Sequence, residues 1–234
     1  MTITTATREG TDGDNADSAR VYVSSGGVTA AAVIDGIGHT SATVALMPVL
    51  AEVVARTAAV KGGPAGLLTA GMLVADGGPE DDGPNAVGAV VTTSPSGRTV
   101  ASWAGDCRVY GWDGTRLRRW TTDHTVGQQL RENGAPWELA EEHDNWLTVA
   151  LSKATPATVY TVVIPDTEQL LLVTTDGVHD QTTHDELEEA IRQKRDGDLQ
   201  TLADAIVVAA GTDPEGYRDD ATVVVLDIRP AATG

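Results

Sequence analysis

The pattern of apolar and polar residues along the chain first predicts a β-hairpin. Residues 20–24 and 28–34 are apolar stretches that flank Gly26-Gly27, a dipeptide typical of tight hairpin turns. The second stretch contains almost no polar residue, which indicates a central strand covered on both faces. It ends abruptly at Asp35-Gly36, so an aspartate directly follows a buried strand.

Helices and further strands are predicted after this hairpin. Apolar residues spaced by three and four positions predict a helix over about 40–54, and Pro64 suits the first turn of a second helix that ends near residue 75. A loop is expected over 76–84, and Gly134-Ala135-Pro136 interrupts a helical pattern over 126–143. Strands are further expected over 86–93, 98–105, 108–112, 115–120, 158–164, 169–175 and 222–228, and helices over about 183–191 and 198–210.

The order of these elements bears on the fold class and the domain organisation. Clusters of strands separated by pairs of helices, with two hairpin-like meanders, favour α+β layers over a doubly wound parallel sheet. No internal repeat, low-complexity linker or change in composition divides the chain, so we expect a single domain over residues 1–234. Residues 1–14 are polar and are expected to form a flexible arm, and residues 229–234 a short tail.

Composition excludes several classes of partner. The 234 residues carry 34 acidic and 16 basic side chains, a formal net charge of −18, which disfavours binding to nucleic acid or to an anionic membrane. Cys107 is the only cysteine, so no internal disulfide is possible, and we expect it to be a small buried apolar side chain. No apolar run approaches the roughly 20 residues of a membrane span, and the N-terminus has no signal-peptide pattern. We therefore expect a cytoplasmic protein.

Aspartates at strand ends carry the candidate chemistry. Asp-Gly occurs seven times, and most copies need only a turn to explain them. Asp35 and Asp176, however, each follow an apolar strand, Asp106 follows the strand over 98–105, and Asp219 directly precedes the last strand. If these four carboxylates converge, cations must offset their repulsion, and ligands that are all carboxylate favour Mg²⁺, Mn²⁺ or Ca²⁺ over Zn²⁺.

Five motifs, in this order, resemble those of the PP2C-like (PPM) metal-dependent phosphatases. Singly each is weak, but together they extend from about residue 15 to residue 228. The motifs are Asn15-x-Asp17-Ser18 with Val33-Ile34-Asp35-Gly36-Ile37-Gly38-His39, then Gly105-Asp106-Cys107-Arg108-Val109-Tyr110, Thr121-Thr122-Asp123-His124-Thr125, Leu172-Val173-Thr174-Thr175-Asp176-Gly177-Val178-His179-Asp180, and Asp219-Asp220-Ala221-Thr222.

The resemblance implies a fold, a reaction and a set of ligands. The fold would be a four-layer α-β-β-α sandwich, in which a central antiparallel β-sandwich is flanked by pairs of helices. The reaction would be hydrolysis of phosphoserine or phosphothreonine by a water activated by two, or three, Mn²⁺ or Mg²⁺ ions. By motif, the metal ligands would be Asp35 between two ions, the Gly36 carbonyl, Asp176, Asp219 and, for a third ion, Asp106 with Asp180 acting through water.

The chain also departs from the family pattern near the substrate. Family members usually carry an arginine that binds the substrate phosphate at the position of Asp12, and here Arg8 is the nearest replacement, with Arg20 a second. His39 is another candidate to bind phosphate, although the segment before it is one glycine short of the family motif. Asp220 stands where the family has asparagine. The direct carboxylate ligands are all present, which favours an active enzyme with altered substrate binding.

Three functions follow from these observations. The leading one is a monomeric protein phosphatase whose partner is a phosphoprotein substrate. The missing arginine and the shortened glycine segment keep open a second, a phosphatase-like regulatory module that binds a phosphoprotein or a kinase without turnover. The third is a metal-dependent phosphoesterase for small metabolites on the same fold.

Overall fold

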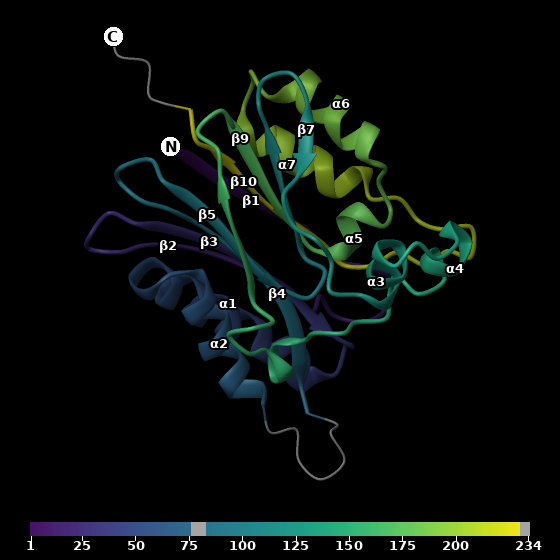
Figure 1. Cartoon of the computed structure of the whole chain (residues 1–234). Helices are drawn as coiled ribbons and strands as arrows, with labels where there is room; N and C mark the ends of the chain where they lie inside the picture. Colours follow the sequence, from purple (N-terminus) through teal and green to yellow (C-terminus); the bar gives the residue numbers. More distant parts are fainter. Residues whose placement is uncertain (76–82, 230–234) are drawn as a thin grey trace.

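Two antiparallel sheets lie face to face in the protein, for which we describe a computed structural model covering residues 1–75 and 83–229 (Figure 1). Most of the loop expected over 76–84 lies outside the described residues. We call the first sheet the β10 sheet; its strand order is β1-β10-β9-β6-β7. Its strands are β1 (Thr2–Arg8), β10 (Ala221–Asp227), β9 (Leu170–Thr174), β6 (Arg108–Trp112) and β7 (Leu117–Arg119).

The second sheet, which we call the β3 sheet, contains the predicted hairpin. Its strand order is β2-β3-β4-β5-β8, and each neighbouring pair is antiparallel. β3 pairs with β2 across the Gly26-Gly27 turn and with β4 on its other side, as expected for a central strand. The strands are β2 (Asp17–Val23), β3 (Thr29–Ile37), β4 (Asn85–Thr93), β5 (Thr99–Ala104) and β8 (Tyr160–Ile164).

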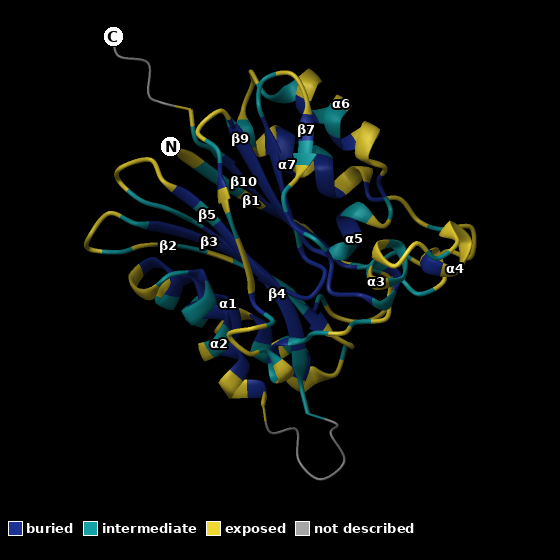
Figure 2. Cartoon of the chain, in the orientation of Figure 1, coloured by how far each residue is buried: buried dark blue, intermediate teal, exposed yellow. Residues whose placement is uncertain are grey.

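Pairs of helices cover the outer faces of the two sheets. Helices α1 (Ser41–Lys61) and α2 (Gly63–Val74) share a buried core with the β3 sheet, while α6 (His184–Lys194) and α7 (Leu199–Ala209) share one with the β10 sheet. A third core, rich in Val and Ala, lies between the sheets and includes the buried Cys107. The buried residues in Figure 2 follow these interfaces. The predicted four-layer α-β-β-α sandwich is confirmed.

Capping residues explain where the helices begin. The side chain of Thr40 accepts a hydrogen bond from the Thr43 amide at 3.1 Å, so α1 begins where the sequence predicts. Thr183 and Glu186 form a reciprocal capping box at the start of α6. α1 is also long and apolar enough, by length and composition, to cross a membrane. Its inner face packs in the core with the β3 sheet, which accounts for that apolar character.

The prediction of a flexible arm over residues 1–14 is wrong. Thr2–Arg8 forms strand β1, which pairs with β10 from Thr2↔Asp227 to Arg8↔Ala221. Beyond the strand, the amides of Gly10 and Thr11 donate to the Asp220 carboxylate and the Arg218 carbonyl, at 2.6 and 2.8 Å. The segment is polar because its strand lies at the edge of a sheet, and its threonines are β-branched residues that suit a strand. Of the expected tail, only residue 229 is described.

Three of the remaining elements lie at one end of the sandwich, and the fourth packs against α2. Helices α3 (Val126–Glu132) and α4 (Trp137–Glu141) divide the predicted helical region at the Gly134-Ala135-Pro136 break, as expected. The single-turn helix α5 (Asp176–His179) and the 3₁₀ turn η1 (Leu151–Lys153) were not predicted, since each is too short to show a period. Figure 1 shows α3, α4 and α5 together near the ends of β9 and β10.

Candidate functional site

The hairpin β2–β3 places two aspartates side by side. Asp17 lies opposite Asp35 in the pairing, so both side chains project from the same face. The amide of Gly36 donates to the Ala16 carbonyl at 3.1 Å. A Cβ on Gly36 would lie 2.8 Å from that carbonyl oxygen and 2.9 Å from a methyl of Thr43, so only glycine fits after Asp35.

The ends of β9 and β10 bring Asp176 and Asp219 together. Asp176 opens α5 directly after Thr175, whose hydroxyl accepts a hydrogen bond from the Thr222 amide at 2.9 Å. The two segments are so close that a Cβ on Gly177 would lie 2.0 Å from the Asp220 carbonyl oxygen. Glycine after Asp176 is therefore a packing requirement as well as a turn preference.

A turn that requires glycine, directly after β5, presents Asp106. Gly105 has a φ of +105°, and a Cβ there would lie 2.2 Å from the Cβ of Val87. His124 holds this turn from both sides: its Nδ1 accepts from the Gly105 amide at 3.1 Å, and its own amide donates to the Gly105 carbonyl at 3.0 Å. His124 is thus a residue that positions Asp106, and burial lowers its pKa, in keeping with a neutral ring.

These turns converge on one cavity of about 290 Å³, which we call the acidic cavity. Five of the predicted ligands line it: Gly36 and four aspartates that come from four separate segments of the chain. Among the described residues that line it there is no lysine or arginine. The lining residues are Asp12, Asp35, Gly36, Ile37, Gly38, His39, Val87, Asp106, Asn145, Leu147, Asp176, Tyr217 and Asp219.

The carboxylates of the acidic cavity raise one another's pKa values. Burial, and then the charges of Asp176, Asp17 and Asp106, raises the pKa of Asp35 well above its ordinary value. The pKa of Asp106 is raised to about 7 by burial and then by Asp123, and that of Asp176 to about 7 by burial, Asp106 and Asp219. Such a cluster favours any bound cation that neutralises it.

The cavity has the chemistry of a site for hard cations. Buried oxygens of Asp35 (Oδ2) and Asp106 (Oδ1) have no hydrogen-bond partner, a costly arrangement that a cation would relieve. Within residues 1–75 and 83–229, no three His, Cys, Asp or Glu side chains already converge on one point to hold an ion. Mg²⁺-type ions keep several waters and bind through one or two carboxylates each, so the spread carboxylates still fit such ions.

Asp17 is a site residue that the sequence analysis did not name as a ligand. Its Oδ2 accepts a hydrogen bond from the Thr175 hydroxyl at 2.8 Å, which links β2 to the turn before Asp176. Burial and then the Asp176 charge raise its pKa, an effect that the Thr175 hydrogen bond partly offsets. The signal was available, since counting back from the Gly26-Gly27 turn puts residue 17 opposite residue 35.

His39 and Asp220 form a polar contact beside the cavity. His39 lines the acidic cavity, and its Nε2 lies 3.1 Å from Oδ2 of Asp220. The buried Asp220 carboxylate also accepts from the amides of Gly10 and Ala16, at 2.6 and 2.7 Å. The aspartate that replaces the family's asparagine therefore anchors the N-terminal segment and His39.

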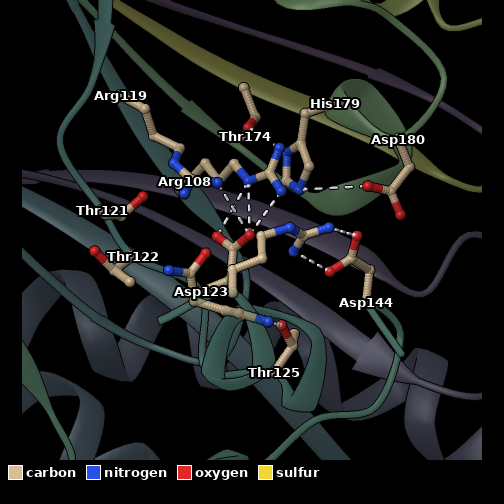
Figure 3. Close-up of polar contacts among 12 residues, drawn as sticks. Arg108, Arg119, Thr121, Thr122, Asp123, Thr125, Asp144, Thr174, His179 and Asp180 are labelled. Atoms are coloured by element: carbon tan, nitrogen blue, oxygen red, sulfur yellow. Dashed lines mark hydrogen bonds and ion pairs between the residues drawn. The ribbon is translucent and has the colours of Figure 1, made fainter. Parts of the chain in front are cut away.

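Three predicted site residues, Arg8, Arg20 and Asp180, lie outside the acidic cavity. Arg20 is exposed and pairs with Glu52 of α1. The guanidinium of Arg8 donates to backbone carbonyls at the end of α7, including that of Ala210 at 2.9 Å, so its placement does not support a role in phosphate binding. Asp180 follows α5, its side chain is 46% exposed, and it lines a neighbouring cavity. Figure 3 shows it beside His179 and near Arg108.

Comparisons with known proteins find likeness in structure only. No protein-family model matches the chain, and no curated protein matches it. The serine/threonine phosphatase Stp1 from Staphylococcus aureus superposes with a TM-score of 0.82 at 14% identity, covering 97% of this chain and 95% of that one. A serine/threonine phosphatase of S. agalactiae gives 0.83 at 17%, covering 96% and 98%.

A third solved structure extends the likeness. The PPM Ser-Thr phosphatase MsPP from Mycobacterium smegmatis, in complex with cacodylate, gives a TM-score of 0.77 at 21% identity and covers 97% of this chain and 98% of that one. These matches span nearly the whole of each chain, so the likeness concerns the complete layered architecture and its strand order. The chain therefore has the fold of the PP2C-like (PPM) serine/threonine phosphatases.

Proposed function

We propose that this protein is a metal-dependent protein phosphatase that hydrolyses phosphoserine or phosphothreonine. The observation that carries the proposal is the meeting of four aspartates, from four strand ends, in one cavity without a neighbouring arginine or lysine among its described lining residues. That arrangement occurs in a fold shared with solved serine/threonine phosphatases. We further propose that the protein acts in the cytoplasm, as a monomer, on phosphoprotein substrates.

The ligand roles follow the order of the motifs. Asp35, the Gly36 carbonyl, Asp176 and Asp219 would hold two Mn²⁺ or Mg²⁺ ions. Asp106 would hold a third ion, with Asp180 contributing through water. Bound ions would lower the pKa of a water molecule and offset the charge on the phosphoryl oxygens.

The other polar groups of the cavity would orient the substrate. Because Asp12 occupies the position of the usual arginine, the side-chain donors among the described lining residues are His39, Asn145 and Tyr217. The pKa of Tyr217 is raised by burial and then by the charge and hydrogen bond of Asp219, so its hydroxyl keeps its proton. The contact with Asp220 would fix the ring of His39 through Nε2.

Mn²⁺-dependent hydrolysis of para-nitrophenyl phosphate tests the proposal. We expect turnover by the wild type that EDTA abolishes and that Asp176→Asn reduces by about 100-fold or more, since second-sphere changes at metal sites alone cost 10–100-fold. Asp204→Asn, on the exposed face of α7, is the matched control and should keep wild-type activity.

Two other outcomes would each indicate a different function. Folded protein that binds Mn²⁺ and phosphopeptides but turns over neither phosphopeptides nor the aryl phosphate would replace the proposal with the regulatory binding module. Higher kcat/KM for sugar phosphates than for every phosphopeptide tested would replace it with the small-molecule phosphoesterase.

A further inference from the structure

A second cavity adjoins the acidic cavity and differs from it in charge. It has a volume of about 630 Å³ and is lined by three arginines, Arg108, Arg119 and Arg131, together with the indole of Trp137. Asn145 lines both cavities, so they share a wall. Because the surface of this chain is strongly acidic overall, three arginines beside the acidic cavity need an explanation.

The buried carboxylate of Asp123 holds two of these arginines. Arg108 donates to it through Nε at 3.1 Å and Nη2 at 2.6 Å, and Arg119 donates through Nη1 at 3.1 Å (Figure 3). The Nε and Nη2 of Arg119 have no hydrogen-bond partner within the described part of the chain, and its side chain is 32% exposed. The three groups carry a net charge of +1, and Arg119 retains donors for a ligand.

Arg131 and Trp137 supply an aromatic surface beside them. Arg131 forms a two-pronged ion pair with Asp144, and its guanidinium lies 4.5 Å from the centroid of the Trp137 ring. Trp137 is 61% exposed. An exposed indole stacked on an arginine offers a rigid contact for an extended peptide.

We propose that this second cavity is a substrate subsite, which binds an acidic side chain near the phosphorylated residue of a phosphopeptide. The inference rests on the proposed function. With the phosphoryl group in the acidic cavity, the peptide passes Asn145, and Arg119 lies where a flanking carboxylate can accept its free donors. Three carboxylates, Glu141, Asp180 and the Asp144 that pairs with Arg131, also line the subsite, so it suits a single carboxylate at Arg119 and rejects polyanions such as nucleic acid.

Matched phosphoserine peptides test the subsite. One series carries a single Glu at successive positions on either side of the phosphoserine, and the control series carries Gln at the same positions. We expect one Glu position to raise kcat/KM over its Gln partner by about fivefold, the upper range for a partly exposed ion pair, and the preference to fall with added salt. Because the Glu and Gln peptides are compared on the same enzyme, the ratio of their kcat/KM values does not depend on the overall activity of that enzyme.

Variants assign the preference to Arg119. Arg119→Gln should bring the ratio to about 1, and Arg119→Lys, which keeps the charge but loses the fork, should give an intermediate ratio. Arg116→Gln removes the same charge from an exposed side chain that pairs with Asp113 and lines neither cavity, so it should keep the wild-type ratio. An unchanged ratio in Arg119→Gln, or a ratio lost equally in Arg116→Gln, overturns the proposal.

Equilibrium binding of the same peptides, followed by fluorescence anisotropy, separates this proposal from the proposed function. If no peptide is hydrolysed but the Glu peptide binds more tightly and Arg119→Gln removes the difference, the subsite stands and the phosphatase activity fails. If peptides are hydrolysed and bound with no preference for Glu at any position, the subsite fails and the phosphatase activity stands.

Discussion

Removal of one carboxylate from the acidic cavity should stabilise the metal-free protein. Burial, Asp106 and Asp219 raise the pKa of Asp176 from 3.8 to about 7. Between these values the folded protein holds more protons than the unfolded chain, so its stability falls as pH rises through that window. Above pH 7 Asp176 is ionised in the folded protein, and its charge lowers the free energy of unfolding by about 4 kcal/mol for a pKa difference of this size.

Denaturation in urea with EDTA measures this cost. At pH 8 we expect Asp176→Asn to be more stable than the wild type by up to about 4 kcal/mol, because asparagine has nearly the same shape without the charge. At pH 4 the difference should be close to zero. With excess Mn²⁺ the order should reverse, because the ions stabilise the wild type by binding its folded state. Asp204→Asn should behave as the wild type throughout.

Two results would refute this reasoning. One is a variant that is less stable than the wild type in EDTA at pH 8, which would mean that Asp176 is held by favourable contacts. The other is a stability difference that is the same at pH 4 and pH 8, which would mean that the effect does not come from the charge. A lack of reversal with Mn²⁺ would count against Asp176 as a ligand.

Three further predictions concern other residues of the site. Asp12→Arg should lower the KM for a phosphopeptide by about tenfold or more in steady-state kinetics, because a charge-assisted hydrogen bond to the phosphate contributes about that much binding. An unchanged KM would mean that residue 12 does not reach the phosphate. Gly105→Ala should lower the free energy of unfolding by more than about 1 kcal/mol, because alanine is strained at a φ of +105° and its Cβ would clash with Val87. Thermal melting measures this loss, and a variant as stable as the wild type would contradict the turn described here. Asp220→Asn should cost about 1–3 kcal/mol, because an amide nitrogen cannot accept from the Gly10 or Ala16 amides; equal urea midpoints for the two proteins would argue against this anchor.

The sequence predicted well wherever the pattern was local and strong. The hairpin of β2 and β3, the caps of α1 and α6, and the two helix pairs each depend on residues close together along the chain. Strand β1 was missed because its partner, β10, lies more than 200 residues away, so nothing in a polar, threonine-rich N-terminus shows that it completes a sheet. A single-turn helix such as α5 is too short for its period to be read.

The candidate site was predictable to the level of its carboxylates and no further. Each aspartate could be placed at the end of a strand, and the structure brings Asp35, Asp106, Asp176 and Asp219 together. The contacts that tune them depend on distant pairs: Thr175 on Asp17, and His124 on the turn that carries Asp106. Arg8 was chosen because it lies close in sequence to position 12, where the family has arginine. Closeness in sequence does not show where a guanidinium points.

The pairing of β1 with β10 has a consequence for synthesis on the ribosome. Strand β1 emerges before every other described strand, yet its only described neighbour is β10, which also pairs with β9. Contacts this far apart in sequence form slowly, because a long loop must close first. Asp35 emerges more than 180 residues before Asp219, so the nascent chain cannot assemble the acidic cavity until Asp219 and β10 have left the ribosome. Any dephosphorylation by this protein would therefore begin only after β10 has emerged and joined its sheet.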